Sequence, residues 1–338
     1  MKGILIENFI QNYADLKVSD IPDPRPKNHE ILIRVHAAGV NFVDLLYARG
    51  KHQNNKSLVI PPFILGLEFS GTVISAPRQS RFSPGDHVYG GNQGSYASML
   101  SARESSIHHI PEGWNLKSSA SLGATAPVSY GALILRGGLR KGETVLVHAA
   151  AGGLGLMAVQ IAKAFGAKVI ATASTKEKLE VARKFGADGC VDYSGNQEWW
   201  KIVLELTDGK GVDLVFDSVG LVDLSLRCLS HGGRILVVGF AGREGNLEKL
   251  AVNKILLKQA RIIGYRFGET DRRNPEETLQ VWKGLNEMLK KGLIKPIIFD
   301  KTYNGLDSVA KALEDLSSRK VWGKAVVMIE EFVKEAKL

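Results

Sequence analysis

The stretch "HAAAGGLGLMAVQIAKAFGAKVIATAS", from His148 to Ser174, decides the fold class of this chain. The buried-strand pattern "TVLVHAA" runs into it, and glycines, a helical pattern of apolar residues and a second strand-like run follow. Gly153 to Ala158 fit the pattern G-x-G-x-x-A, in the strand–turn–helix context that a dinucleotide-binding turn requires. The stretch therefore predicts an α/β unit of the Rossmann type with a parallel sheet.

The glycines of this turn have separate physical roles. The turn out of the strand needs backbone angles open to glycine, and the next glycine leaves no side chain between the backbone and a pyrophosphate. The start of the helix then offers N–H groups and partial positive charge to phosphates. A tight turn of an ordinary α/β protein would use the same residue types. We expect a cofactor to be held by the segment Gly152, Gly153, Leu154 and Gly155.

The end of the second strand predicts which dinucleotide binds. NAD-binding units usually carry Asp or Glu there, which accepts from the ribose 2′-OH. This chain has Ser174 at that point, which leaves room for a 2′-phosphate, and Lys178 can supply a countercharge. Tyr193, after the next strand, can donate from its hydroxyl. The residues favour NADPH over NADH, although Lys178 is also the kind of lysine found on a solvated helix face.

The rest of the chain has two textures. Up to about residue 125 the apolar runs are short and alternating, as in "EILIRVHAAGV", which is typical of half-buried strands. From about residue 140 strands alternate with helices, which predicts a parallel sheet covered on both faces. After about residue 270 the pattern predicts a helix at 275–291, a strand at 296–303, a helix at 306–318 and a closing strand at 324–329. No fixed-period repeat is present in the sequence.

Composition excludes several classes of protein. The 338 residues carry a formal net charge of +9, but basic residues are spread among acidic ones, so nucleic acid is not the expected partner. No run approaches a membrane span, and the first residues lack a signal-peptide pattern. Cys190 and Cys228 form no CxxC pair, which excludes a disulfide framework and favours a reducing compartment.

Several motifs together resemble the quinone oxidoreductase branch, the zeta-crystallin-like group, of the medium-chain dehydrogenase/reductase superfamily. They are "AAGVNFVDLLYARG", "GLEFSGTV", "PGDHVYG", "HAAAGGLG", "FGAD", "SHGGRILVVGF" and "GKAVV". The resemblance implies a GroES-like, β-rich catalytic domain at residues 1–124, completed by 271–338. It also implies a Rossmann NADP-binding domain at 125–270, and a homodimer.

The resemblance also implies roles for single residues. Asn41 and Tyr47 would be catalytic and lie beside the nicotinamide and the acceptor, and Tyr47 would hydrogen-bond an acceptor carbonyl. Many relatives carry a threonine near the carboxamide, where this chain has Val128 or Ser129, depending on the alignment. Further cofactor contacts implied in this way are Gly239, Phe240, Tyr265, Phe267 and, at the 2′-phosphate, Arg319.

Zinc enzymes of the superfamily read G-H-E where this chain has "GLE", with Leu67 in place of the histidine. The segment "YGGNQGSYASML" lacks the cysteines of a structural zinc lobe, so we expect no tetrahedral metal site. The eight histidines, among them His108 and His109, are interpreted as surface or structural residues. Without a metal, the expected chemistry is hydride donation from NADPH to an electrophilic acceptor.

Three functions remain open from the sequence. The first is NADPH-dependent reduction of quinones, and the second is reduction of an enone, a 2-alkenal or an enoyl thioester such as an enoyl-CoA. The third is a non-catalytic, NADPH-dependent RNA-binding or crystallin-like role, which only the basic charge favours.

The last three residues, Ala336, Lys337 and Leu338, form a variant of the S-K-L peroxisomal address. They predict recognition by a peroxisomal import receptor. A basic helical end that carries no address would look the same, and the enzyme would then be cytoplasmic.

Overall fold

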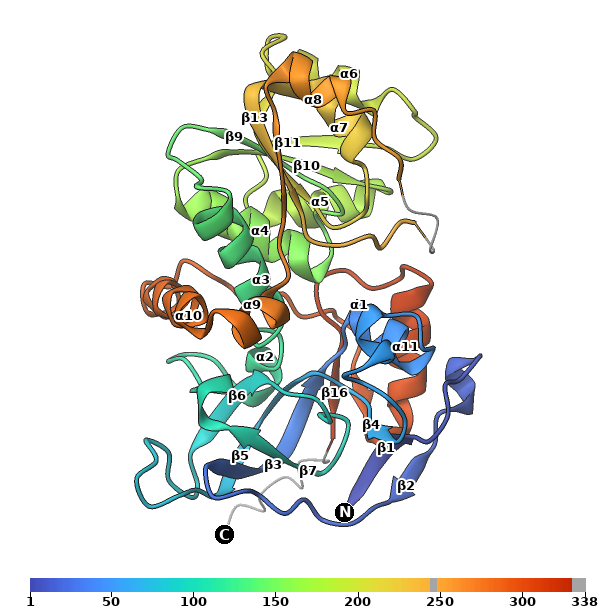
Figure 1. Ribbon diagram of the computed structural model, residues 1–338, viewed down its shortest axis with the longest axis vertical. Coiled ribbons are helices and arrows are strands. Elements are labelled where there is room, and N and C mark those ends of the chain that lie inside the picture. Colours follow the sequence, from blue (N-terminus) through green and yellow to red (C-terminus); the bar gives the residue numbers. More distant parts are fainter. Residues whose placement is uncertain (244–247, 330–338) are drawn as a thin grey trace. The chain divides into compact units, whose positions relative to one another are not determined.

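The computed structural model describes residues 1–243 and 248–329. The chain forms two compact units, one made of Met1–Ala124 with the segment that starts at Pro296, and the other of Thr125–Lys295. Figure 1 labels the helices and strands of each unit. In the described residues no helix is both long and apolar enough to cross a membrane.

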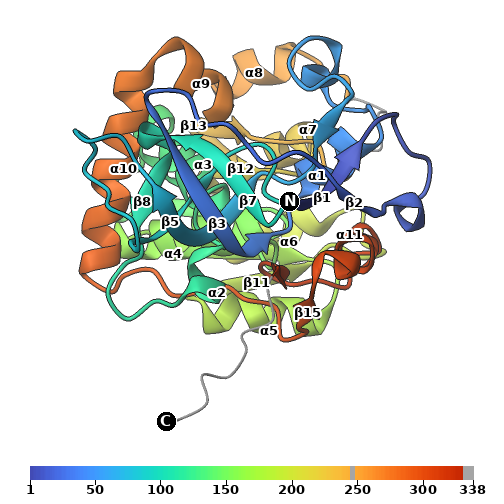
Figure 2. The same ribbon diagram turned by 90° about the horizontal axis from the view of Figure 1, so that it is seen from below.

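The first unit is built on a sheet with the strand order β15-β16-β3-β5-β6-β8, and β7 also pairs with β3; all these pairs are antiparallel except β15 with β16. A second sheet has the order β2-β1-β4. Figure 2 shows β3, β5 and β7 beside one another. The strands are β1 (Lys2–Ile6), β2 (Val18–Asp20), β3 (Glu30–Gly39), β4 (Phe63–Ile64), β5 (Glu68–Ser75), β6 (His87–Gly91), β7 (Met99–Arg103), β8 (Ile107–His109), β15 (Tyr303–Asn304) and β16 (Val326–Met328).

Strand β3 is the centre of this sheet, because β5, β7 and β16 all pair with it. Buried residues alternate with more exposed ones in the first part of β3. Ala37, Ala38 and Gly39 are then all buried, and these residues pair with β16. The helices of the unit are short: α1 (Phe42–Ala48), α2 (Leu116–Ser119) and α11 (Val309–Ser317). One apolar cluster joins β3, β5 and α11. The strand expected at 296–303 is only a bridge at Ile298 and the short β15.

The second unit holds a parallel sheet with the order β11-β10-β9-β12-β13-β14. From β9 the chain moves outward to β10 and β11, and it then returns to the other side of β9 to form β12, β13 and β14. The strand order therefore reverses between β9 and β12. The strands are β9 (Thr144–Val147), β10 (Lys168–Ala173), β11 (Gly189–Asp192), β12 (Val212–Asp217), β13 (Leu229–Val237) and β14 (Arg261–Gly264).

Helices cover both faces of this sheet, as expected for parallel strands (Figure 1). Helices α6 (Trp199–Glu205), α7 (Val222–Cys228) and α8 (Asn253–Lys258) share one apolar cluster with the strands. Helices α4 (Gly153–Ala164) and α5 (Lys176–Lys184) pack against β9, β10 and β11. The remaining helices are α3 (Thr125–Tyr130), which continues into a π-helical segment over Gly131–Arg136, α9 (Phe267–Arg273) and α10 (Pro275–Lys290).

The return to the first unit lies later than the sequence predicts. We expected residues 271–338 to complete the first domain, but α10 and the chain up to Lys295 belong to the second unit. The ring of Tyr130 in α3 occupies the space where Gly284 of α10 lacks a side chain. The amide of Gln160 in α4 forms hydrogen bonds with the backbone N–H and C=O of Lys295. Helix packing, which sequence periodicity does not reveal, thus shifts this boundary to 295/296.

Candidate cofactor and catalytic site

The glycine turn of the second unit follows β9 directly. The backbone N–H of His148 still donates to Phe216 of β12, and α4 then begins at Gly153 with Gly152 as its N-cap. A Cβ atom on Gly155 would lie 2.4 Å from the carbonyl oxygen of Ala149, so only glycine lets α4 start this close to the turn. Ala149 itself is left-handed, with φ of 46°. Gly152 has φ of −81°, so the unusual backbone angle that we expected at a glycine of the turn belongs to Ala149, and glycine is needed at Gly155 for close packing instead.

Ser129 lies against this turn. Its hydroxyl is on the buried helix α3 and donates to the carbonyl oxygen of Leu154 at 2.9 Å. This hydrogen bond fixes the first turn of α4. The first N–H groups of α4 have no partner within the helix and are available to a ligand. The structure thus brings two residues of the expected cofactor set into direct contact.

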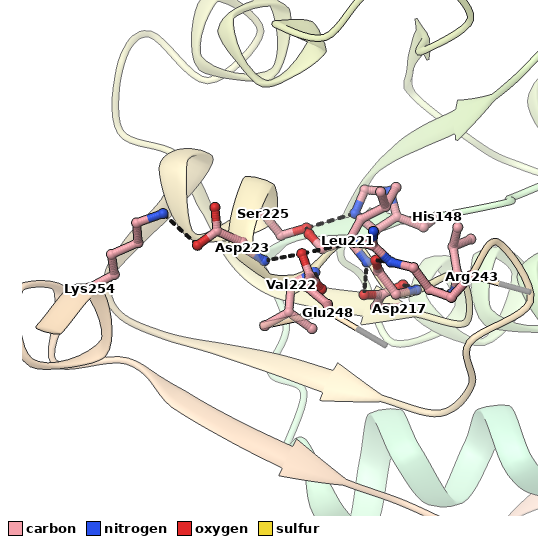
Figure 3. A network of polar contacts seen from close by, with 11 residues as sticks. His148, Asp217, Leu221, Val222, Asp223, Ser225, Arg243, Glu248 and Lys254 are labelled. Carbon is pink, nitrogen blue, oxygen red and sulfur yellow. Dashed lines mark hydrogen bonds and ion pairs between the residues drawn. The ribbon is translucent and has the colours of Figure 1, made fainter. Parts of the chain in front are cut away.

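The turn also lies where the strand order reverses, which is where open α/β sheets bind ligands. At the neighbouring end of β12, the buried carboxylate of Asp217 accepts three backbone N–H groups, from Val219, Gly220 and Leu221, at 2.7–2.8 Å (Figure 3). Gly220 has φ of 94°, a conformation that favours glycine. The loop over residues 218–221 is therefore held in one conformation beside the glycine turn.

The end of β10 carries the residues expected to choose the cofactor. Ser174 precedes Thr175, which caps α5 by accepting the N–H of Lys178 at 3.3 Å. The N–H of Tyr193 donates to Ala173, so the chain after β11 lies beside the end of β10. Asp192 was overlooked in the sequence. This residue of β11 is in register with Ala173, so a carboxylate lies on the strand next to the end of β10. Hydrogen bonds from Ser194 lower its pKa, and the charge of Lys176 adds to this effect.

The ends of β13 and β14 place a second group of expected residues. Val237 and Gly264 are in register, so the segments that follow them start from the same sheet edge. A Cβ atom on Gly239 would lie 3.2 Å from the carbonyl oxygen of Ser218, so the loop after β13 rests on the loop after β12. Phe240 is 49% exposed, whereas Phe267 packs edge-on against Trp282.

Asn41 and Tyr47 lie in the first unit, on α1. Asn41 is the N-cap, and Tyr47 lies six residues, or nearly two helical turns, further along and is buried. The side-chain amide of Asn54 donates to the phenol oxygen of Tyr47 at 2.9 Å, and the ring of His52 packs edge-on against the phenol. Asn54 was not expected from the sequence, because it lies on the segment after α1 and carries no motif.

The amide of Asn41 belongs to a buried charged network. Its nitrogen donates to Glu68 at 3.0 Å and to the carbonyl oxygen of Gly39 at 3.2 Å, and its oxygen accepts from Lys324 at 2.6 Å. Lys324 and Glu68 form an ion pair of 2.9 Å, with side-chain exposures of 2% and 0%. The backbone N–H of Ala124 donates to the other oxygen of Glu68. The ammonium group of Lys324 is thus held between a carboxylate and an amide oxygen.

Asp44 extends this network. One carboxylate oxygen accepts from the backbone N–H of Asn41 at 2.8 Å and from the hydroxyl of Tyr96 at 2.7 Å. The other oxygen is buried and has no hydrogen-bond partner in the part of the chain that the structure describes. Burial raises the pKa of Asp44 to about 7, although the hydrogen bonds from Tyr96 and Asn41 act in the opposite direction.

Comparison with known proteins identifies the family. Residues 27–112 match the family described as "Alcohol dehydrogenase GroES-like domain", and residues 153–284 match "Zinc-binding dehydrogenase". Quinone oxidoreductase-like protein 2 of Rattus norvegicus is 36% identical over 322 residues, covering 91% of this chain and 87% of its own. Quinone oxidoreductase of Homo sapiens is 33% identical over 303 residues, covering 88% of both chains. The chain belongs to the quinone oxidoreductase family of the medium-chain dehydrogenase/reductase superfamily.

A solved structure agrees with this assignment. The Escherichia coli quinone oxidoreductase, crystallised with NADPH, has a TM-score of 0.85 and 26% identity, covering 97% of this chain and 100% of its own. The expected fold class, a GroES-like domain with a Rossmann domain, is confirmed, and the chain is an oxidoreductase. No three His, Cys, Asp or Glu side chains gather as a metal-binding group within residues 1–243 and 248–329.

The catalytic and cofactor-binding residues predicted from the sequence of this quinone oxidoreductase family member are divided between the two units. Asn41, Tyr47 and Arg319 belong to the first unit, where Arg319 follows α11 with a left-handed φ of 59°. The other expected cofactor residues belong to the second unit. No role for Lys324 was predicted from the sequence, although the motif "GKAVV" that contains it was recognised. The available signal was a lysine among the apolar residues of the last predicted strand. Ala336, Lys337 and Leu338 lie outside the described residues.

Proposed function

We propose that the chain is an NADPH-dependent quinone oxidoreductase that transfers hydride from NADPH to a quinone without a metal ion. The observation that carries this proposal is the end of β10, where Ser174 replaces the carboxylate of NAD-binding units and Lys178 lies in the first turn of α5. NADPH would supply the hydride, and the protein residues would bind and orient it.

The second unit fits such a cofactor. The N-terminus of the twelve-residue helix α4, which Gly155 allows to start close to the turn, suits a pyrophosphate. Lys178 and Tyr193 are proposed to bind the 2′-phosphate, together with Arg319 of the first unit. The cofactor site is proposed to be completed by Ser129 of α3, Gly153 and Leu154 of α4, the loop residues Gly239 and Phe240, and Phe267 of α9.

The acceptor is proposed to bind at α1. Tyr47 would donate its hydroxyl hydrogen to the acceptor oxygen and stabilise the charge that develops there as hydride arrives. The hydrogen bond from Asn54 holds the phenol oxygen in place, and Asn41 would orient the N-terminus of α1 toward the same acceptor.

Lys324 supports metal-independent chemistry. Its ammonium group already binds Asn41 and Glu68, the oxygen ligands that a cation would need at α1. A metal ion there would have to displace a buried positive charge, which is unfavourable at short range. Dialysis against a chelator is expected to leave activity unchanged, and activity that zinc restores would contradict the proposal.

The test of function is NADPH oxidation measured against a panel of quinones, 2-alkenals, enones and enoyl-CoA thioesters. The proposal expects the highest kcat/KM with a quinone. A preference for an enone or a thioester would replace quinone reductase by enoyl reductase, and no oxidation with any acceptor would favour a non-catalytic role. RNA binding with a steep salt dependence would support that last outcome.

A homodimer is proposed through the second unit. Strand β14 pairs with β13 on one side only among the described strands, and Val252, Leu256 and Leu257, at the start of and on the preceding helix α8, are 74–77% exposed. Open strand edges beside apolar side chains favour association, and we propose a second copy of this chain as the partner. Sedimentation should give the mass of a dimer, and the double variant L256E/L257E should give a monomer. An intact chain that sediments as a monomer would rule this out.

Peroxisomal import is a separate proposal that rests on Ala336, Lys337 and Leu338 alone. A fluorescent protein fused to the N-terminus should give punctate signal in cells that contain peroxisomes. Diffuse signal, identical to that of a fusion that lacks Leu338, would make the enzyme cytoplasmic.

A further inference from the structure

A buried histidine lies directly behind the glycine turn and has no part in the function proposed above. The side chain of His148 is fully buried, and its ring packs edge-on against Trp199 with centroids 5.1 Å apart. Its Nδ1 atom is 2.9 Å from the hydroxyl of Thr172 on β10, and its Nε2 atom is 2.8 Å from the hydroxyl of Ser225 on α7. Figure 3 shows the contact between the His148 ring and the hydroxyl of Ser225.

The direction of these hydrogen bonds follows from the last acceptor, which is a backbone carbonyl oxygen. The hydroxyl of Ser225 donates to the backbone carbonyl oxygen of Leu221 at 2.7 Å. A hydroxyl has one hydrogen, so toward His148 the Ser225 oxygen must accept. Nε2 therefore carries a hydrogen. Burial lowers the pKa of His148, although the charge of Asp217 acts against it, so the ring is neutral and Nδ1 accepts from Thr172.

The result is a one-way series of hydrogen bonds from Thr172 through His148 and Ser225 to Leu221. It cannot reverse, because the last acceptor is a backbone carbonyl. The N–H of the same Leu221 donates to Asp217 at 2.7 Å, and its carbonyl oxygen accepts the backbone N–H of Ser225 at 2.9 Å as well as the hydroxyl. The series therefore fixes the loop at the end of β12.

We propose that His148 is a positioning residue for cofactor binding, which sets the loop over residues 218–221 relative to the glycine turn. The imidazole links three neighbouring segments at the strand-order reversal: the residues after β9, the end of β10 and the start of α7. The N–H of Ala150 in the glycine turn also donates to the backbone of Thr172, so the turn and the imidazole share β10 as their support. This inference rests on the proposed NADPH site.

The loop after β13 extends the same arrangement. The N–H groups of Ala241 and Gly242 donate to Ser218 and Val219, so this segment rests on the loop that the series fixes. Arg243 donates to Gly220 at 2.6 Å and pairs with Glu248 at 3.0 Å (Figure 3). A displaced loop at residues 218–221 would therefore also displace Gly239 and Phe240. A defect in the series should appear as weaker cofactor binding, with little effect on the acceptor.

The experiment compares three conservative variants with one control. T172V removes the hydroxyl that donates to His148, S225A removes the link to Leu221, and H148L removes both contacts. T278V is the matched control, because Thr278 is a buried residue of the same unit whose hydroxyl has no hydrogen-bond partner among the described residues. NADPH affinity is measured by fluorescence titration, and kcat and the quinone KM at saturating NADPH.

We expect the Kd for NADPH to rise about tenfold in S225A and H148L, and less in T172V, whereas kcat and the quinone KM stay within about twofold. The double variant H148L/S225A should bind NADPH about as well as S225A alone, because the two residues act in one series. T278V should match the wild type. Nitrogen NMR of the His148 ring should show a protonated Nε2 and an unprotonated Nδ1 with or without cofactor.

The outcomes separate this inference from the proposed function. A wild-type protein that binds NADPH, with S225A and H148L binding it equally well, overturns the positioning role alone. A protonated Nδ1 beside an unprotonated Nε2 overturns the hydrogen-bond series. A wild-type protein that binds no NADPH overturns the proposed function and the role of His148 in cofactor binding together. If H148L does not fold, S225A and T172V still decide the question.

Discussion

Each unit of the molecule has a buried polar network at its candidate site, and the two networks are made of different groups. In the first unit, Lys324 and Glu68 are buried side chains of opposite charge, bridged by the amide of Asn41. In the second, His148 and Ser225 link through neutral groups, and the charge of Asp217 faces backbone N–H groups. The chain thus fixes its two sites in physically different ways.

This difference predicts different responses to substitution. Removal of one partner of a buried ion pair leaves an uncompensated charge, which typically costs about 3–5 kcal/mol. Removal of one neutral hydrogen bond costs about 1 kcal/mol. We expect single substitutions in the first network to affect folding, and those in the second to affect mainly the placement of loops.

The largest expected effect is on the stability of the first unit. In K324M the carboxylate of Glu68 loses its ammonium partner while it stays buried, so we expect the unit to lose about 3–5 kcal/mol of stability. The double variant K324M/E68Q removes the charge as well and should regain part of this loss. Hydrogen exchange followed by mass spectrometry measures each unit separately, which matters because a two-unit chain need not unfold in one step.

The control for this prediction is K2M. Lys2 pairs with Asp20 at 3.6 Å in the same unit, but both side chains lie largely in solvent. Exposed pairs contribute about 0–1 kcal/mol, so K2M should barely change the exchange rates. Equal losses in K324M and K2M would remove the distinction between the two networks.

The second prediction concerns pH and Asp44. A pKa of about 7 in the folded state lies above the ordinary 3.8, so the folded unit holds more protons between these values. Stability of the first unit should therefore fall as pH rises from about 4 to about 7, by up to about 4 kcal/mol. D44N should flatten this dependence. A first unit that becomes more stable over this range would show that Asp44 is ionised throughout.

The sequence predicted the elements of the second unit well, because its turn chemistry is local. The residues from His148 to Ser174 contain a strand, a glycine turn, a helix and a second strand, and each of these signals lies within a few residues. The place of α10 could not be predicted in this way. It depends on packing between Tyr130 and Gly284, which are far apart in the sequence.

The candidate site shows the same limit. The glycines of the turn and Ser174 at the end of β10 belong to a local sequence motif with fixed spacing, so they can be predicted from the sequence. Lys324 contacts Asn41 from 283 positions away, and Ser225 contacts His148 from 77 positions away. Their partners are set by strand pairing and helix packing, which a single sequence does not reveal. Hence His148 was grouped with the other histidines as a surface or structural residue, and Lys324 was overlooked.

The third prediction separates the proposed acceptor side from the cofactor side. Y47F removes the hydroxyl that would stabilise the acceptor oxygen, so we expect kcat with quinones to fall about 10- to 100-fold. The Kd for NADPH should not change, since the proposed phosphate contacts lie in the second unit apart from Arg319. Y13F, in the same unit, tests for a general effect of losing a phenol hydroxyl. An unchanged kcat in Y47F would exclude this tyrosine from the reaction.

The fourth prediction, which has the smallest effect, concerns the choice between NADPH and NADH at the end of β10. The wild type should bind NADPH at least about tenfold more tightly than NADH, a difference of about 1.4 kcal/mol. K178A should remove most of this preference and leave NADH binding nearly unchanged, because NADH lacks the 2′-phosphate that the ammonium group would pair with. The matched control is K184A, which removes the same charge from the last turn of the same helix. Fluorescence titration of all three proteins with both cofactors gives the result. If K184A and K178A weaken NADPH binding equally, the effect is the general attraction of a basic surface, and Ser174 alone would have to account for any preference.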